Sequence, residues 1–181
     1  TVHLGGNIGT PLFDRIPDIR PDDFAVLELS SFQLHSMHCA PDVAIITNIS
    51  PNHLDVHPDL EDYVSAKCSI YRGQRPDGVL VLNARDAHTP HFAAEAPGSV
   101  RYFSSVGPVE NGVYCSDGVI YRAHDGRAER LIDVSDIRIP GAHNVENYMA
   151  AFAATDGLVG QAACVQVARS FAGVPHRMER I

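Results

Sequence analysis

The chain has 181 residues, of which 45% are hydrophobic and 20% are charged, so it is long enough for one globular domain with a substantial core. Its net charge is −8 (14 Lys and Arg against 22 Asp and Glu) and it has no basic block, which argues against a nucleic-acid surface. No apolar run approaches the ~20 residues that a membrane span needs, and no signal-peptide pattern opens the sequence.

The cysteines and the chain ends indicate the redox environment of the protein and the extent of the chain. Four cysteines are scattered without a CxxC pair: Cys39, Cys68, Cys115 and Cys164. We interpret them as reduced, mostly buried thiols of a cytoplasmic protein, and not as zinc ligands or a disulfide framework. The sequence begins TVHLGG without a methionine and stops at HRMERI, so we expect it to be part of a longer chain.

Short apolar runs alternate with helical patterns over the first hundred residues. Strands are expected at 2–4, 24–30, 42–50, 79–83 and 100–104. Helices are expected near 11–16, from Ser30 or Ser31 onward, at 59–73 and near 88–96. This alternation predicts right-handed βαβ units in an α/β fold, with a mainly parallel, doubly wound sheet that has helices on both faces. The run FAVLELS (24–30) has the composition of a strand that is buried on both faces.

The pattern changes after Val106. The dipeptides Asp117-Gly118 and Asp125-Gly126 separate alternating runs, which predicts a hairpin or a three-stranded antiparallel β appendage. Helices at 141–155 and 162–173 are expected to close the domain.

One helix carries an unexpected residue. In DLEDYVSAKCSIYRG (59–73), Asp59 is a candidate N-cap and Gly73 a candidate stop, and the apolar face includes Lys67. The structural explanation is that the stem of this lysine packs while its ammonium group reaches water. The chemical alternative is that the amine lies in a site and takes part in its chemistry.

Ligands of doubly wound sheets bind at the carboxyl ends of the strands, where Glu28 and His53 are expected. If the strands at 24–30 and 42–48 are neighbours, Glu28, His53 and Lys67 converge. Glutamate and histidine can hold Mg²⁺ or Mn²⁺, whereas an ammonium group would repel it. A buried lysine with a lowered pKa can instead add CO₂ and become an anionic carbamate ligand. The structural alternatives are a salt bridge or a simple strand end for Glu28 and a simple loop position for His53.

A second group of polar residues lies near the end of the chain. Asn144 and Asn147 share one face of a helix, where their carboxamides suit the edge of a purine; helix capping by Asn144 is the alternative. Arg177 follows His176 and could hold a phosphate, because the planar guanidinium group can donate two hydrogen bonds to it.

Six segments together resemble the Mur ligase family, in order and over nearly the whole chain. They are GGNIGTP (5–11), LELSSFQL (27–34), ITNISPNHLDVH (46–57), YVSAKCSIY (63–71), GAHNVENYMAA (141–151) and FAGVPHRME (171–179). Of these, LELSSFQL and GNIG are similar to the member that adds D-glutamate. Other Mur ligases and folylpolyglutamate synthase share the HN..N and carbamylated-lysine regions but differ in those two segments.

The resemblance implies an ATP-dependent amide ligase of peptidoglycan precursor synthesis. Its substrates would be UDP-N-acetylmuramoyl-L-alanine and D-glutamate, joined through an acyl phosphate. Its cofactors would be ATP, Mg²⁺ (or Mn²⁺) and CO₂ as the lysine carbamate, and it would act as a cytoplasmic monomer without nucleic-acid or membrane partners.

The resemblance also implies roles for individual residues. Lys67, as a carbamate, and His53 would be catalytic, and with Glu28 they would hold the metal. The residues expected to contact the nucleotide-sugar are Asn7, Ser30, Gln33 and His53. Those expected to contact ATP are Asn144, Asn147 and Arg177.

Residues 1–181 differ from a complete ligase. The phosphate-binding pattern G-x-x-x-x-G-K-[ST] is absent, and in the family it precedes the GNIG strand. The amino-terminal UDP-binding domain and the carboxy-terminal amino-acid-binding domain are absent as well, so we expect a central ATP-binding domain. Asn52 stands where an acidic residue is frequent. Two alternatives stay open: a sister ligase of the Mur or folylpolyglutamate type, and a non-catalytic nucleotide-binding domain.

Overall fold

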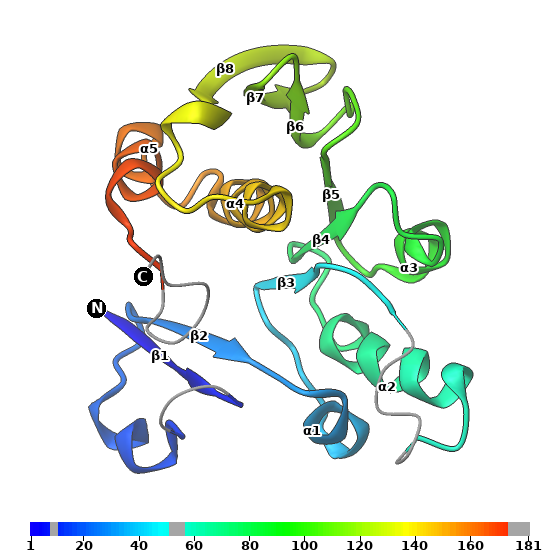
Figure 1. Ribbon diagram of the computed structural model, residues 1–181. Coiled ribbons are helices and arrows are strands. Elements are labelled where there is room, and N and C mark those ends of the chain that lie inside the picture. Colours follow the sequence, from blue (N-terminus) through cyan, green and yellow to red (C-terminus); the bar gives the residue numbers. More distant parts are fainter. Residues whose placement is uncertain (8–10, 51–56, 174–181) are drawn as a thin grey trace.

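The computed structural model describes residues 1–7, 11–50 and 57–173 and shows an α/β fold (Figure 1). The strands are β1 (Val2–Gly6), β2 (Phe24–Glu28), β3 (Val43–Ile46), β4 (Val79–Asn83), β5 (Ser99–Ser104), β6 (Gly112–Ser116), β7 (Val119–His124) and β8 (Arg127–Asp133). The α-helices are α1 (Ser31–Ser36), α2 (Leu60–Arg72), α3 (Thr89–Glu95), α4 (Ala142–Thr155) and α5 (Gln161–Ser170). Two 3₁₀ helices, η1 (Phe13–Asp18) and η2 (Val134–Asp136), complete the elements.

The strands form two sheets. Strands β3 to β8 lie in chain order in a six-stranded sheet, and β1 pairs with β2 in a separate parallel sheet. Pairing is parallel from β3 to β6 and antiparallel from β6 to β8. The mainly parallel sheet with a small antiparallel part is therefore confirmed. Because β6 pairs directly with β5, the antiparallel strands extend the main sheet and do not stand apart from it.

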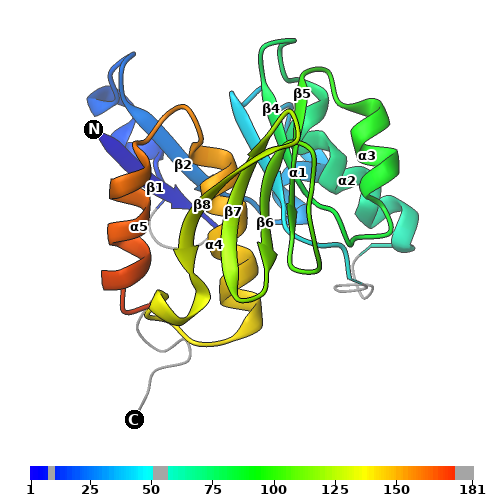
Figure 2. The same cartoon turned by 90° about the horizontal axis from the view of Figure 1, so that it is seen from above.

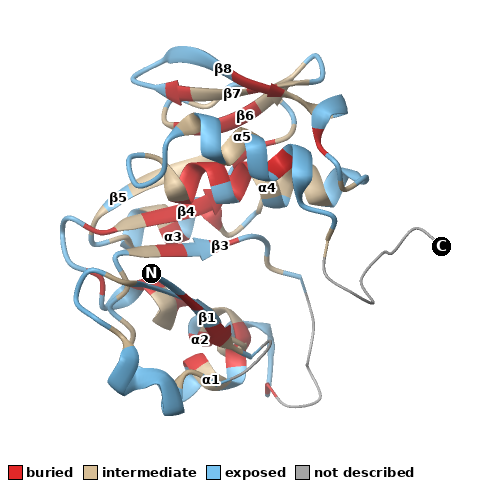
Figure 3. Ribbon diagram, turned by 90° about the vertical axis from the view of Figure 1, so that its left-hand side faces the viewer, coloured by how far each residue is buried: buried red, intermediate tan, exposed pale blue. Residues whose placement is uncertain are grey.

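Helices cover both faces of the six-stranded sheet, with α2 and α3 on one side and α4 and α5 on the other (Figures 1 and 2). Strand β4, which lies between β3 and β5, contacts both helical layers. Its Val81 belongs to the apolar cluster that contains Met149 of α4, whereas Leu80 and Leu82 belong to the cluster that contains Tyr71 of α2. Figure 3 shows buried residues along β4 and the facing side of α4. Burial on both faces explains why the strand sequence VLVLN is continuously apolar.

The two Asp-Gly turns have the backbone that the sequence predicts. Asp117 and Gly118 have φ values of 51° and 74°, and Asp125 and Gly126 have 49° and 73°. Two successive positive φ values define the type I′ turn, whose twist suits antiparallel strands.

The ends of α2 also agree with the sequence. The carboxylate of Asp59 accepts a hydrogen bond from the backbone N–H of Asp62 (2.8 Å), and the helix ends before Gly73. An added Cβ at Gly73 would collide with the carbonyl oxygen of Cys39, so a close backbone approach requires glycine there.

The expectation that the strand at 24–30 is buried on both faces is wrong, and the strand pairing that was the condition for a shared site is not present among the described residues. Every residue of β2 is exposed, including Phe24 (52%) and Val26 (50%). Moreover, β2 is not the neighbour of β3: within the described ranges β2 pairs only with β1, and β3 only with β4. One edge of each strand thus has no hydrogen-bonded strand beside it, and β2 lacks the covering layers that its composition suits. The helix expected near 11–16 is the 3₁₀ helix η1, and β3 ends at Ile46.

A comparison of two glycines tests the close approach between β5 and β6. Gly112 (φ +133°) would place an added Cβ against the carbonyl oxygen of Tyr102, whereas Gly107 (φ +147°) has open space around that position. We expect Gly112→Ala to lower the free energy of unfolding by about 2 kcal/mol or more, and Gly107→Ala by no more than about 1 kcal/mol. Urea denaturation measures both, and equal losses would show that φ alone, and not the close approach, matters.

Candidate functional site

Two polar side chains lie at the common carboxyl end of β1 and β2. Gly6 is paired with Glu28, and the backbone N–H of Asn7 donates to the carbonyl oxygen of Glu28 (2.7 Å). Gly6 has φ +114°, and an added Cβ would collide with that same carbonyl. The glycine therefore allows the strands to approach closely, and the exposed side chains of Asn7 and Glu28 lie at one sheet edge.

The residues after β2 form a helix cap. Ser30 is the N-cap of α1: its hydroxyl accepts from the backbone N–H of Gln33 (3.3 Å), and the Gln33 carbonyl oxygen accepts from the backbone N–H of Ser30 (2.9 Å). This capping box satisfies two backbone donors reciprocally. Ser30 and Gln33, two of the predicted nucleotide-sugar contacts, thus have a structural role in the helix cap, and their contact with substrate stays a prediction.

Lys67 is half-buried on α2. Its Nζ lies 5.7 Å from the centre of the Tyr63 ring. Burial lowers the pKa of Lys67, and the negative charge of Glu28 partly opposes that effect. The structure thus brings two of the three predicted metal ligands within electrostatic reach, although β2 and β3 are not paired.

Lys67 is also the only lysine in the sequence, a feature that the motif reasoning overlooked; the other 13 of the 14 Lys and Arg residues are arginines. Arginine stays charged under all ordinary conditions, whereas lysine can become neutral when it is buried. The one position that has lysine is therefore also one where burial favours the neutral form.

Glu28 itself departs from the expectation. The sequence predicts a carboxylate in a buried strand, but the Glu28 side chain is exposed at the end of an exposed strand. An exposed carboxylate has little desolvation cost, so Glu28 does not require a metal ion or a salt bridge to compensate for burial. His53, Asn52 and Arg177 lie outside the described residues, so the third predicted metal ligand and the predicted phosphate contact have no position here.

The two asparagines of α4 differ in their surroundings. Asn144 is half-buried, and its Nδ2 donates to the carbonyl oxygen of Pro140 (2.6 Å), whereas Asn147 is exposed. Gly141 is the N-cap and makes no side-chain capping bond, so Asn144 stabilises the entry to the helix. Its structural role is thereby established, and the purine contact of the pair stays a prediction.

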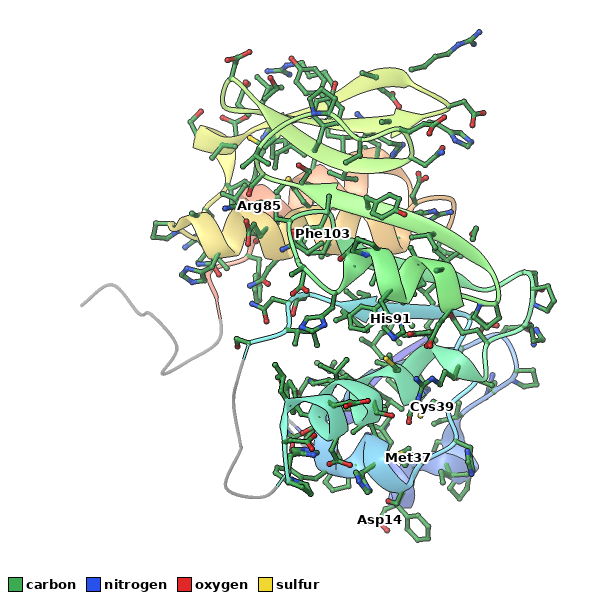
Figure 4. The ribbon with its side chains drawn as sticks, turned by 90° about the vertical axis from the view of Figure 1, so that its right-hand side faces the viewer. Asp14, Met37, Cys39, Arg85, His91 and Phe103 are labelled. Carbon is green, nitrogen blue, oxygen red and sulfur yellow. The ribbon has the colours of Figure 1, made fainter. Side chains whose placement is uncertain are left out.

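A pocket of about 290 Å³ lies beside the carboxyl ends of β3 and β4. It is lined by Asn48, Ile49, Asn83, Arg85, Asp86, Ala87 and Glu146. Glu146 accepts a hydrogen bond from the hydroxyl of Ser105 (2.6 Å) and lies 3.7 Å from Arg85, which Figure 4 labels. The position agrees with the rule for ligands in doubly wound sheets. Glu146 lies on α4, the helix that also carries Asn144 and Asn147.

A larger open depression of about 530 Å³ lies on the β7–β8 hairpin, lined by Arg122, His124, Asp125, Arg127, Ala128 and Glu129. Arg122 pairs with Glu129 (3.6 Å) across it. The β7–β8 hairpin is antiparallel and lies at the opposite edge of the sheet from β3. Since the rule for ligands concerns the carboxyl ends of parallel strands, the smaller pocket is the better candidate for the ligand site.

Cys68, His91 and Glu95 form a further group, with ligand-type atoms all within 4.8 Å of one another. His91, labelled in Figure 4, and Glu95 lie on α3, and Cys68 is buried on α2. Glu95 already accepts hydrogen bonds from Tyr71 (3.1 Å) and Arg72 (3.3 Å). The positive charge of Arg72 therefore neutralises the Glu95 carboxylate, and these hydrogen bonds link α2 to α3.

Comparison with known proteins identifies the family. A family model described as the Mur ligase middle domain matches residues 7–155. The chain belongs to the Mur ligase family. The matched part of this Mur ligase chain contains every predicted site residue except Arg177.

Two curated relatives match nearly the whole chain. The chain is 49% identical over 179 residues to a protein from Acetivibrio thermocellus and 46% identical over 178 residues to one from Ruminiclostridium cellulolyticum. Both are named UDP-N-acetylmuramoylalanine–D-glutamate ligase, and each match covers 98% of this chain and 38% of the relative. The chain thus spans well under half the length of these relatives.

A solved structure shows the same fold. The crystal structure of MurF from Acinetobacter baumannii has a TM-score of 0.67 and 19% identity, with 99% of this chain and 48% of that chain covered. At this identity the similarity establishes the fold of the Mur ligase chain and not its substrate. No helix of the described residues is long and apolar enough to cross a membrane.

Removing the charge of Glu28 tests the electrostatics around Lys67. Since the carboxylate favours the ammonium form, Glu28→Gln should lower the pKa of Lys67 further below its ordinary value. Glu61→Gln, an exposed position on the same helix, is the matched control. A ¹³C-lysine NMR titration reads the single lysine of the chain directly. An unchanged or higher pKa in Glu28→Gln would contradict the proximity.

Proposed function

We propose that this chain is the central ATP-binding domain of a cytoplasmic ligase that adds D-glutamate to UDP-N-acetylmuramoyl-L-alanine. The observation that carries the proposal is the 46–49% identity to two ligases of that name across 98% of the chain. Each match extends over GGNIGTP and LELSSFQL, the two segments whose resemblance is to the D-glutamate-adding member. The fold alone is common to several Mur ligases and does not choose among them.

The open strand edges support the proposal that the domain is incomplete. The free edges of β2 and β3 belong to parallel strands of mixed apolar composition, and β2 leaves Phe24, Val26 and Leu27 exposed. One parallel strand from another part of a longer chain, paired with both edges, would join the two sheets and cover these residues. We assign this strand to the segment that carries the phosphate-binding loop.

The proposed reaction has two steps. First, the carboxylate of UDP-N-acetylmuramoyl-L-alanine attacks the γ-phosphate of ATP, which gives an acyl phosphate and ADP. The amine of D-glutamate then attacks the acyl carbon, and inorganic phosphate leaves the tetrahedral intermediate as the amide forms and the amine loses a proton. The residues proposed to hold the nucleotide-sugar are Asn7, Ser30, Gln33 and His53, and those proposed to hold ATP are Asn144, Asn147 and Arg177.

The residues near Lys67 fit a divalent metal only if the lysine is modified. Glu28 offers an exposed carboxylate, but the ammonium form of Lys67 would repel a cation. Burial favours the neutral amine, which can attack CO₂ and form a carbamate with loss of one proton. Glu28, His53 and the Lys67 carbamate would then hold Mg²⁺ (or Mn²⁺), which supplies positive charge to the phosphoryl oxygens.

The negative charge of the chain and the soluble nucleotide substrates suit a cytoplasmic, monomeric enzyme without nucleic-acid or membrane partners. Assay of the full-length protein with D-glutamate, L-lysine and meso-diaminopimelate tests the substrate. Preference for either of the last two would overturn the D-glutamate assignment.

Lys67→Arg tests the carbamate. Arginine keeps the positive charge but cannot carry the modification, so kcat of the full-length ligase should fall at least about a hundredfold. The control is Arg72→Lys on the same helix, which makes the reverse exchange between arginine and lysine at an exposed position. It should leave kcat within about twofold of wild type. Intact mass of gently handled protein should show one added CO₂. A fully active Lys67→Arg enzyme would mean that Lys67 is only a packed surface lysine.

The proposed strand with the phosphate-binding loop leads to a further prediction, about ATP binding. Residues 1–181 alone should bind ATP weakly, because the phosphate-binding loop normally supplies the backbone N–H groups and the lysine that hold the β- and γ-phosphates. Extending the chain upstream through that loop should tighten ATP binding at least about tenfold, and it should raise the melting temperature because β2 gains a neighbour. Isothermal titration and thermal denaturation measure both effects. Micromolar ATP binding by residues 1–181 would contradict the domain proposal.

A further inference from the structure

Three side chains form a continuous hydrogen-bonded chain between α1 and α2. The Nε2 of His57 lies 2.9 Å from the hydroxyl of Ser31, and its Nδ1 lies 2.7 Å from the carboxylate of Asp62. His57 and Ser31 are each only 3% exposed. Ser31 is the first residue of α1, directly after the Ser30 cap, and Asp62 lies in the first turn of α2.

The chemistry of the partners fixes the direction of these bonds. An ionised carboxylate only accepts, so the Nδ1 of His57 donates to Asp62. The hydrogen bond from His57 is the main reason that the pKa of the Asp62 carboxyl is lowered, which keeps it ionised. In neutral His57, Nε2 is then an acceptor, and the Ser31 hydroxyl donates to it. Asp62 thereby selects the tautomer, and the tautomer orients Ser31.

Aromatic side chains hold the imidazole in place. The Phe32 ring stacks on His57 with centroids 5.3 Å apart and an interplanar angle of 17°, and Tyr63 meets it edge-on at 5.3 Å. His35 approaches the other oxygen of Asp62, with its Nε2 3.2 Å away. The imidazole is thus held by contacts from both helices.

The order Ser–His–Asp is also that of a hydrolase triad, but Ser31 is not placed as a nucleophile. A nucleophilic hydroxyl must reach substrate, whereas Ser31 is almost fully buried at the junction of the two helices. Neither of the two pockets described above is lined by Ser31. The arrangement suits a fixed support better than a reacting group.

We propose that His57 is a positioning residue that, through Ser31 and Asp62, sets the first turn of α1 relative to α2. This inference rests on the proposed function, in which Ser30 and Gln33 of that turn contact the nucleotide-sugar and α2 carries Lys67. The relay, defined as Ser31, His57 and Asp62, holds these two parts of the site in register. Its loss would weaken nucleotide-sugar binding without affecting the ATP side, because Asn144 and Asn147 lie on the separate helix α4.

Steady-state kinetics of the full-length ligase test the relay. Ser31→Ala should raise the KM for UDP-N-acetylmuramoyl-L-alanine about tenfold, the effect of one lost buried hydrogen bond, and leave the KM for ATP unchanged. Asp62→Asn should have an effect of the same kind. The matched controls are Ser36→Ala, which is exposed on α1, and Glu61→Gln, which is exposed on α2. Both controls should behave as wild type.

A double-mutant cycle and NMR separate positioning from general destabilisation. Because both residues act through His57, the effects of Ser31→Ala and Asp62→Asn on KM should be clearly less than multiplicative in the double variant. The ¹⁵N shifts of His57 in the wild-type ligase should show the proton on Nδ1, and Asp62→Asn should reduce that preference.

Three results would overturn the relay: a proton on Nε2 in the wild type, equal increases in both KM values, or labelling of Ser31 by a fluorophosphonate probe, which would make it a nucleophile. Failure of the proposed function would look different. In that case the wild-type protein would not add D-glutamate, while the tautomer of His57 would still report on the relay.

Discussion

Burial of the Lys67 side chain beside the carboxylate of Glu28 is the interaction on which the proposed chemistry depends. Desolvation favours the neutral amine and Glu28 favours the ammonium ion, and the larger effect is desolvation. The balance requires a helix that turns this side chain inward. Asp59 and the close approach at Gly73 fix the two ends of α2. A shift of one residue would rotate Lys67 by about 100° around the helix and return its amine to water.

The two sheets differ in how far they can support a site. The six-stranded sheet has a helical layer on each face, and four of the five residues of its strand β4 are buried (Figures 1 and 3). The two-stranded sheet has little such support, and an isolated pair of strands is at best marginally stable. Yet Asn7, Glu28 and Ser30 all lie at the end of this smaller sheet. The residues proposed to bind the nucleotide-sugar and the metal are therefore attached to the part of the molecule that depends most on neighbours.

Local signals in the sequence predicted local structure well. The Asp59 cap, the helix start at Ser30 or Ser31 and the Asp-Gly turns each lie where the residue types require them, because their physics involves only a few adjacent residues. Strand order was not predictable in this way. The apolar composition of β2 indicates a buried strand, but every residue of β2 is exposed, because the composition of a strand does not determine which neighbours it has.

The candidate site shows the same division. Lys67 stood out because it interrupts a helical period. Its proximity to Glu28 was expected only if the strands at 24–30 and 42–48 were neighbours, and it is present although β2 and β3 are not paired. The pocket between Arg85 and Glu146 was missed, since those residues are 61 positions apart and neither breaks a pattern. The link from His57 to Ser31 was missed for a similar reason: a histidine in a polar loop gives no sign that it will be buried against another helix.

The edge strand β8 carries more charged side chains than the edge strands β2 and β3. Its exposed half carries Arg127, Glu129 and Arg130, and charged side chains on a terminal strand discourage pairing with another molecule. The free edges of β2 and β3 have no comparable charges along their strands, apart from Glu28 at the end of β2. Self-association of this chain through strand pairing would therefore start at β2 and β3 and not at β8. The aggregates would be joined at the edges where we propose that the strand with the phosphate-binding loop pairs.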